Sequence, residues 1–297
     1  MFTRTNPIAF VKQFITDSLD IIKLRISLMQ VITVVWGYWL AHPNPTWTIT
    51  VTWLSLGTFV VSAGVGMLNH YLERQTDQQM VRTQNRPLPG GRFNPTWVFI
   101  LGLCVTMVGV GILFRNVNGV AGFISMITAG LYLLVYTPLK RVSWLNTLVG
   151  AFPGGLPPVG GWATGALTAG VYPLGLGAWL VLAIFIAWQH PHFYAIGYLY
   201  KDDYKRAGIH ILPNSDATGS RMRRHMFISV GVLTLATVWL YRLDVLSIVG
   251  LSIGLVLSAY YLKQSLDMVR TLTNTTAKAL LKGSILYLVL FMLGSVL

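Results

Sequence analysis

The chain has 297 residues, of which 54% are hydrophobic and 10% charged, and its formal net charge is +13. Because a soluble domain usually carries about 25% charged residues, this composition excludes an ordinary soluble protein and indicates an integral membrane protein. The single cysteine, Cys104, excludes an intrachain disulfide and a cysteine-based metal site, and we expect a buried, unreactive thiol.

Nine apolar runs approach the roughly 20 residues that a helix needs to cross a hydrocarbon core of about 30 Å. We therefore predict one all-α, polytopic membrane domain over residues 1–297, with nine transmembrane helices around a central cavity. The predicted spans are 26–43, 48–69, 96–114, 118–137, 147–167, 172–199, 226–241, 245–262 and 278–297.

The basic residues are distributed unevenly between the two sides of this predicted topology. If the N-terminus lies inside, every Lys and Arg except Arg115 and Arg242 falls on an inner segment. This bias follows the positive-inside rule and predicts a cytoplasmic N-terminus. The net positive charge is then a topology signal, so we expect no nucleic-acid partner.

The first polar motif follows the second predicted span and reads NHYLERQTDQQMVRTQNRPLPGGR. Its amide and two carboxylates lie four residues apart, at Asn69, Glu73 and Asp77, so they share one face of a helix. Mg²⁺ binds such oxygens and completes its shell with water and substrate phosphate, and the arginines that follow can bind phosphate bidentately. The motif predicts a magnesium–diphosphate site. The alternative is a helix end with ordinary solvated charges, which are common at membrane interfaces.

The span near residues 150–165 reads GAFPGGLPPVGGWATG and is rich in glycine and proline. Proline removes a backbone hydrogen bond, so a kinked helix that lines a cavity is one interpretation. Close packing of helices through small residues is the other.

The second polar motif, residues 188–213, reads WQHPHFYAIGYLYKDDYKRAGIHILP. His190 and His192 lie near the end of an apolar span, where an imidazole is costly unless it has a partner. They are candidates for haem iron, or for hydrogen bonds to a neighbouring helix. Asp202 and Asp203 follow, and they could bind a second magnesium ion or cap a helix.

The first motif resembles the Asn-x3-Asp-x3-Asp motif of the UbiA-type intramembrane prenyltransferase superfamily. The segments RTQNRPLPGG, YTPLKR, GLPPVGGWA, WQHPHF and DDYKRAGIHILP resemble the haem O synthases, or protohaem IX farnesyltransferases. The resemblance covers about Lys23 to Pro213. The chain departs from the pattern at Glu73, where the family commonly has Asp, and at Gln75, where relatives often have another acid. Tyr204 favours Asp203 over Asp202 as the family's acid.

The resemblance implies transfer of a farnesyl group from farnesyl diphosphate to the vinyl group of haem B, with addition of water, giving haem O and diphosphate. It implies a Mg²⁺-dependent enzyme in the lipid bilayer of the inner (plasma) membrane, with its active site facing the cytoplasm and a haem A synthase or terminal oxidase as candidate assembly partners. The residues implied as metal-binding or catalytic are Asn69, Glu73, Asp77, Asp202 and Asp203. Those implied to bind the diphosphate are Arg82, Arg86 and Lys140, and those implied to bind haem are His192 and, second, His190.

Two other functions remain open at the level of the sequence. Another aromatic polyprenyltransferase of the same superfamily, in a quinone or chlorophyll pathway, would explain both acidic motifs but not WQHPHF. A non-enzymatic haem-binding transporter would explain a broken glycine-proline span, because discontinuous helices build midplane sites. It would not explain acids at the inner surface.

Overall fold

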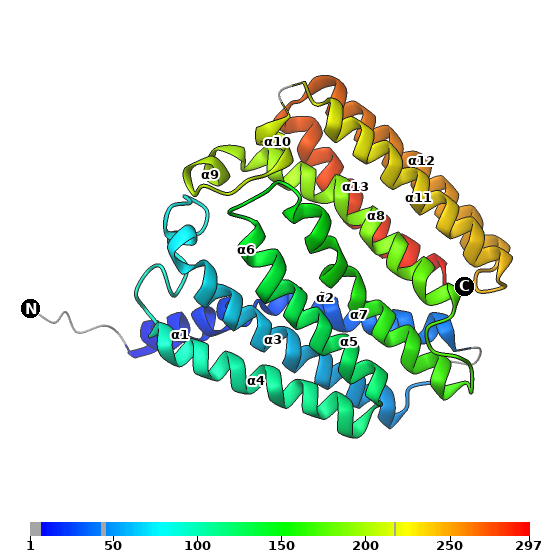
Figure 1. The fold of residues 1–297 in the computed structure, drawn as a ribbon, viewed down its shortest axis with the longest axis horizontal. Helices are drawn as coiled ribbons and strands as arrows, with labels where there is room; N and C mark the ends of the chain where they lie inside the picture. The colour runs from blue at the N-terminus through cyan, green and yellow to red at the C-terminus, as the bar shows by residue number, and fades with distance from the viewer. Residues whose placement is uncertain (1–6, 43–45, 217) are drawn as a thin grey trace, which may run out of the picture.

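The computed structural model describes residues 7–42, 46–216 and 218–297, and these residues form helices joined by connections, of which the one between α3 and α4 runs from 79 to 94 (Figure 1). The prediction of an all-α membrane protein is confirmed. Seven helices of the described residues are long and apolar enough to cross a membrane. Helices α7 and α12, with 23 and 24 residues, are of similar length but are not among these seven. The count of nine spans and the side of the N-terminus stay predictions, and position 43, the predicted end of the first span, lies outside the described residues.

Each predicted span corresponds to one long helix, except the fourth, which consists of an α-helix, a π-helical segment and a short α-helix. The long helices are α2 (Leu24–Ala41), α3 (Ile49–Gln78), α4 (Pro95–Asn116), α5 (Gly119–Gly130), α7 (Asn146–Thr168), α8 (Leu176–Leu199), α11 (Ser220–Arg242), α12 (Ile248–Thr271) and α13 (Asn274–Gly294). Shorter helices precede or connect them: α1 (Pro7–Ile21), a π-helical segment (Leu131–Tyr136), α6 (Thr137–Leu139), α9 (Lys201–Arg206) and α10 (Leu212–Ser215).

Helix α3 carries the first polar motif. Thr48 caps its first turn by accepting a hydrogen bond from the backbone N–H of Val51. Its 30 residues extend about 45 Å at 1.5 Å per residue, which exceeds the hydrocarbon core of about 30 Å. The last turns of α3 therefore extend beyond the apolar layer, and they bring the motif to one end of the molecule.

The fourth span changes from an α-helix to a π-helix before it ends. Helix α5 continues into the π-helical segment and then into α6, where Pro138 lacks the N–H of a regular helix. The hydroxyl of Thr137 donates to the carbonyl of Tyr132 at 2.8 Å. This wider turn sets the direction of Thr137 and Lys140, and π-turns in helices are frequent at functional sites.

Helices α2 and α7 approach each other closely through glycine. A Cβ atom added at Gly161 would lie 1.9 Å from the carbonyl oxygen of Val34, and one at Gly165 would lie 2.3 Å from that of Tyr38. Helix α7 is helical throughout despite three internal prolines. The glycines on this side of α7 thus serve close helix packing, the second interpretation of the span.

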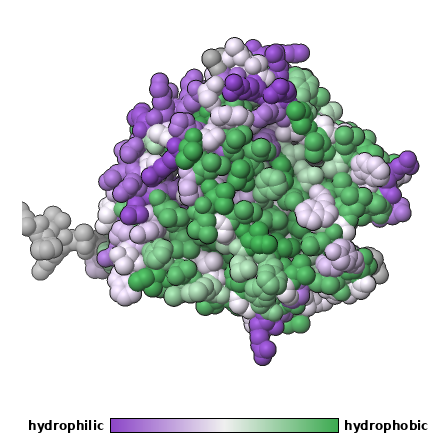
Figure 2. Space-filling model, viewed as in Figure 1, coloured by the Kyte–Doolittle hydropathy of each residue, from purple (hydrophilic) through white to green (hydrophobic). Residues whose placement is uncertain are grey.

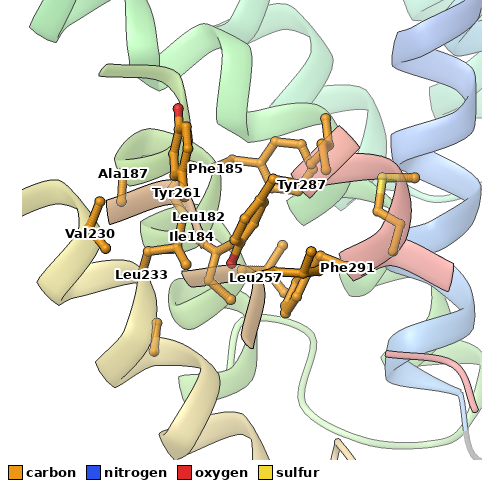
Figure 3. Close-up of a cluster of buried hydrophobic side chains, with 14 of the residues drawn as sticks. Leu182, Ile184, Phe185, Ala187, Val230, Leu233, Leu257, Tyr261, Tyr287 and Phe291 are labelled. Atoms are coloured by element: carbon orange, nitrogen blue, oxygen red, sulfur yellow. The ribbon is translucent and has the colours of Figure 1, made fainter. Parts of the chain in front are cut away.

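The largest apolar core extends from α2, α5 and α7 to the C-terminal helices, and Figure 3 shows its part between α8, α11, α12 and α13. Tyr261 and Tyr287 are fully buried there, with ring centroids 5.4 Å apart, and Tyr287 stacks on Phe291 at 5.8 Å. The hydroxyl of Tyr261 donates to the carbonyl of Trp188 at 2.8 Å. This core therefore holds α8, which carries the second motif, against the C-terminal helices.

The surface separates into polar and apolar regions. Figure 2 shows hydrophilic residues gathered over the end that bears α9 and the α3–α4 connection, whereas hydrophobic residues cover the helices below it. Cys104 lies exposed on α4, so the prediction of a buried thiol is wrong. It faces outward with the apolar side chains Leu101, Leu103 and Val108, as expected for a helix surface in contact with lipid.

Candidate functional site

Asn69 lies fully buried where α3 meets the α1–α2 junction and α6. The ammonium of Lys23 donates a hydrogen bond to its side-chain oxygen, and its amide nitrogen donates to the hydroxyl of Thr137 at 3.3 Å. Lys23 takes a left-handed backbone conformation, with φ of 49°, between α1 and α2. Burial lowers the pKa of Lys23 to about 8.

Glu73 lies one turn further along α3. Its Oε1 accepts from the ammonium of Lys140 at 2.6 Å, and both side chains are less than a fifth exposed. The same ammonium lies 4.4 Å from the ring centroid of Tyr136. Burial alone would lower the pKa of Lys140, but Glu73 and the neighbouring tyrosines raise it well above its ordinary value. Lys140 is therefore cationic at neutral pH.

Asp77 completes the face of α3. Its Oδ2 accepts from Arg86 at 2.8 Å, and the hydroxyl of Thr83 donates to its backbone carbonyl at 2.9 Å. The connection after α3 thus folds back, which brings Arg86 to the carboxylate. The spacing of Asn69, Glu73 and Asp77 puts them on one face of one helix, as predicted, and each is held by a different basic side chain.

Asp203 joins the second motif to the first. Its Oδ1 accepts from the backbone N–H of Val81 at 3.3 Å, and its Oδ2 accepts from that of Arg82 at 3.2 Å. Arg206 also pairs with Oδ1. Burial alone would raise the pKa of Asp203, but these hydrogen bonds lower it. The two polar motifs are therefore in contact, although they are far apart in the sequence.

Asp202 and Arg82 lie at the rim of this contact. Asp202 is exposed and makes no hydrogen bond or ion pair with the described residues. The guanidinium of Arg82 lies 4.8 Å from the ring centroid of Tyr200 at the end of α8. Arg82 thus faces α8, whereas Arg86 faces Asp77.

A small cavity of about 60 Å³ lies between α6, α7, α8 and the segment after α9. Its lining includes Tyr136 and Lys140 on one side, Phe193 on α8, and Tyr204 next to Asp203. Lys140 lines this cavity and also binds Glu73, so the cavity adjoins both polar motifs. Its volume suits a small group and not a whole prenyl chain.

His190 and His192 point their Nδ1 atoms at different partners. Nδ1 of His190 lies 2.7 Å from the carbonyl oxygen of Ile186, which can only accept, so this nitrogen carries the proton. Nδ1 of His192 lies 2.7 Å from the hydroxyl of Ser284, which itself donates to the carbonyl of Leu281. Both rings therefore carry their lone pair on Nε2, the form in which imidazole binds a metal. Neither histidine lines the cavity described above.

The first motif has the donor set of a hard-cation site. Oε2 of Glu73 and Oδ1 of Asp77 accept no hydrogen bond from the described residues, so one oxygen of each carboxylate is free to bind a metal. Within the described part of the chain, no group of three His, Cys, Asp or Glu side chains is already placed around one point. Two carboxylates and an amide would leave positions for water and diphosphate, as Mg²⁺ requires.

Three residues at this site were not singled out from the sequence. Thr137 and Tyr136 belong to the segment YTPLKR, and only their contacts with Asn69 and Lys140 give them a place here. Lys23 precedes the first apolar run and has no spacing relation to the motif. An isolated cation at the start of a span was the available signal, and it is common in membrane proteins.

Known proteins resemble this chain over nearly its whole length. Residues 30–293 match the model of the UbiA prenyltransferase family. A protoheme IX farnesyltransferase of Salinibacter ruber is 36% identical over 92% of this chain and 94% of its own length. A protoheme IX farnesyltransferase of Solibacter usitatus is 33% identical over the same shares.

Solved structures resemble the fold at low sequence identity. One from work on a digeranylgeranylglyceryl phosphate synthase has a TM-score of 0.75, with 15% identity, over 95% of this chain and 98% of that one. A UbiA homolog from Archaeoglobus fulgidus, bound to DMAPP and Mg²⁺, has a TM-score of 0.65, with 11% identity, over 94% and 99%.

Proposed function

Because the chain belongs to the UbiA prenyltransferase family and, within it, to the protoheme IX farnesyltransferases, we propose that it transfers a farnesyl group from farnesyl diphosphate to a vinyl group of haem B. Water adds in the same reaction, and the products are haem O and diphosphate. The observation that carries the proposal at the level of residues is the polar face of α3. There, Asn69, Glu73 and Asp77 are each in contact with a cation of another segment.

The charges on this face suit a diphosphate and a divalent cation. Glu73 and Asp77 supply two negative charges, and Lys23, Lys140 and Arg86 supply three positive ones. Mg²⁺ held by Asn69, Glu73 and Asp77 would neutralise charge on the leaving diphosphate. Lys140 and Arg86 would then exchange their carboxylate partners for phosphate oxygens, since both side chains can form charge-assisted hydrogen bonds.

The second motif has two roles in this proposal. Asp203 holds the Val81–Arg82 turn, so it would position the segment that carries Arg82 and Arg86 for contact with the diphosphate. Asp203 also stays a candidate for a second metal position with Asp202. His192, or second His190, orients haem B through Nε2, since Nδ1 of each ring is fixed by a hydrogen bond. Phe193, Ile196 and Ile209 line the cavity beside Lys140, and they would limit capture of the allylic cation by bulk water before it meets the vinyl group.

The proposed location follows from the charge bias of the connections. The polar end, with both motifs, faces the cytoplasm, and the protein resides in the inner (plasma) membrane. Candidate assembly partners are a haem A synthase or a terminal oxidase, which would receive the haem product. Because the positive charge follows the topology, we expect no nucleic-acid partner.

The proposal is tested by offering alternative acceptors to the purified protein in lipid nanodiscs. With farnesyl diphosphate and Mg²⁺, we expect a more hydrophobic haem from haem B and no product from a phenolic acid. Prenylation of the phenol but not of haem would assign the chain to another reaction of the superfamily. His192→Ala should change the Soret band of bound haem, whereas Asp202→Ala should leave that band unchanged.

A further inference from the structure

Helix α1 presents three different faces along its 15 residues. One face is buried against the protein and includes Asp17 and Ile21. A second face carries Val11, Ile15 and Leu19, spaced four residues apart and exposed by 54%, 53% and 41%. Thr16 and Asp20 lie on a third, polar and exposed face. A helix that packs on a protein in water has one apolar face against the protein and one polar face in water. The exposed apolar face of α1 fits neither of these two environments, so it indicates a contact with something other than water.

The protein side of α1 is firmly attached to the α3–α4 connection. Arg92 donates from Nε and from its terminal nitrogen to the two carboxylate oxygens of Asp17, at 2.6 and 2.8 Å. Phe14 stacks on Phe93 with ring centroids 5.6 Å apart. Ile21 packs in the cluster that also includes Leu88. The position of α1 along the molecule is therefore set by the residues just before α4.

The start of α4 marks the boundary of the apolar layer. The 22 residues of α4 extend about 33 Å, which matches a hydrocarbon core of about 30 Å. Trp97, in its first turn, is 63% exposed, as is typical of the aromatic residues found at membrane–water interfaces. Because α1 packs on Phe93, just before α4 begins, α1 lies at the level of the lipid head groups.

We propose that α1 is an interfacial helix, whose Val11–Ile15–Leu19 face inserts among the acyl chains of the adjacent leaflet. At about 22 Å α1 is too short to span the bilayer, and it contains Lys12, Asp17 and Asp20. Asp17 is neutralised by Arg92, and Lys12 and Asp20 balance each other, so α1 offers no positive patch for anionic lipids. The partner is the apolar part of the bilayer, whatever the head-group charge.

Helix α1 leads directly into Lys23, whose ammonium binds Asn69, and the carbonyl of Asp20 lies 3.1 Å from Nε2 of His70 on α3. Insertion of α1 into the leaflet would therefore fix the segment that carries Lys23 against the polar face of α3.

Spin labels on α1 test this proposal without any measurement of activity. In a Cys104→Ser background, which removes the single native cysteine, labels are placed by Val11→Cys and Ile15→Cys and, as matched controls on the polar face, by Thr16→Cys and Asp20→Cys. Power saturation in phosphatidylcholine vesicles compares collisions with oxygen, which partitions into lipid, and with a nickel chelate, which stays in water.

We expect collisions with oxygen to dominate at Val11 and Ile15 and collisions with nickel to dominate at Thr16 and Asp20, with the same pattern after anionic lipid is added. Dominant nickel collisions at all four positions would place α1 in water and overturn the proposal. Low collision rates with both reagents at Val11 and Ile15 would also overturn it, because another protein surface would then cover this face. A pattern that appears only with anionic lipid would contradict insertion by apolar contact.

Discussion

Replacing Asp203 by asparagine should release the turn after α3 from α9. The carboxylate accepts two backbone N–H groups, from Val81 and Arg82, and its side chain is 10% exposed. Asparagine has one accepting oxygen, so one of these two hydrogen bonds is lost and an NH₂ group then faces a backbone donor. Arg206 is half exposed, and its ion pair adds little.

The magnitude follows from the strength of a hydrogen bond to a charged acceptor. Loss of one such bond, together with the new donor–donor contact, should lower the free energy of opening of this turn by about 2 kcal/mol. Since 1.4 kcal/mol corresponds to a factor of ten, the open population of the turn should rise about 30-fold.

Limited trypsin digestion measures that population, because cleavage at a transiently opened site follows its equilibrium opening when reclosing is fast. We expect the peptide that ends at Arg82 to appear about 30-fold faster in Asp203→Asn than in the unmodified chain. Asp202→Asn is the matched control, since it removes the same charge from the exposed neighbour. Circular dichroism checks that both variants keep their helices. Equal cleavage of the two variants at Arg82 would refute the assignment of Asp203 as the residue that joins the two motifs.

Three further predictions concern the metal site, the helix packing and α1. Asp77→Asn should lower turnover about 10³-fold while bound haem keeps its Soret band, because charge stabilisation of the leaving diphosphate is lost; near-normal turnover would contradict the magnesium site. Gly161→Ala should destabilise the protein by about 1–3 kcal/mol in thermal unfolding, since its Cβ would lie 1.9 Å from a carbonyl oxygen of α2. The adjacent Gly160→Ala, whose nearest contact would be 3.5 Å, should be tolerated, and equal effects would contradict the packing. Hydrogen bonds from Arg92 hold the pKa of Asp17 below its ordinary 3.8, although burial opposes them, so the attachment of α1 is present above that pH and lost as pH falls through the lowered pKa. A spin label on α1 should gain mobility over this acidic range, whereas in Asp17→Asn its mobility should not depend on pH there.

The helices and the first motif could be predicted from the sequence because both depend on local periodicity. Apolar runs of sufficient length identify the spans, and a spacing of four residues puts Asn69, Glu73 and Asp77 on one face of α3 whatever surrounds it.

Local periodicity does not predict which atoms of distant segments come into contact. Lys23 binds Asn69 across 46 positions, and Asp203 binds the N–H of Val81 across 122. Composition also does not tell which side of an apolar helix faces lipid, and for this reason Cys104 was wrongly predicted to be buried. The roles of the glycines in α7 depend on the carbonyls of α2, which spacing alone does not reveal.

The most direct test of the proposed reaction is the balance between its two products. Purified protein in nanodiscs is given haem B, farnesyl diphosphate and Mg²⁺, and released diphosphate and prenylated haem are both measured over time. We predict equal amounts of the two products, and neither of them when the metal is chelated. Diphosphate released without prenylated haem, or at an unchanged rate after chelation, would contradict the proposed function.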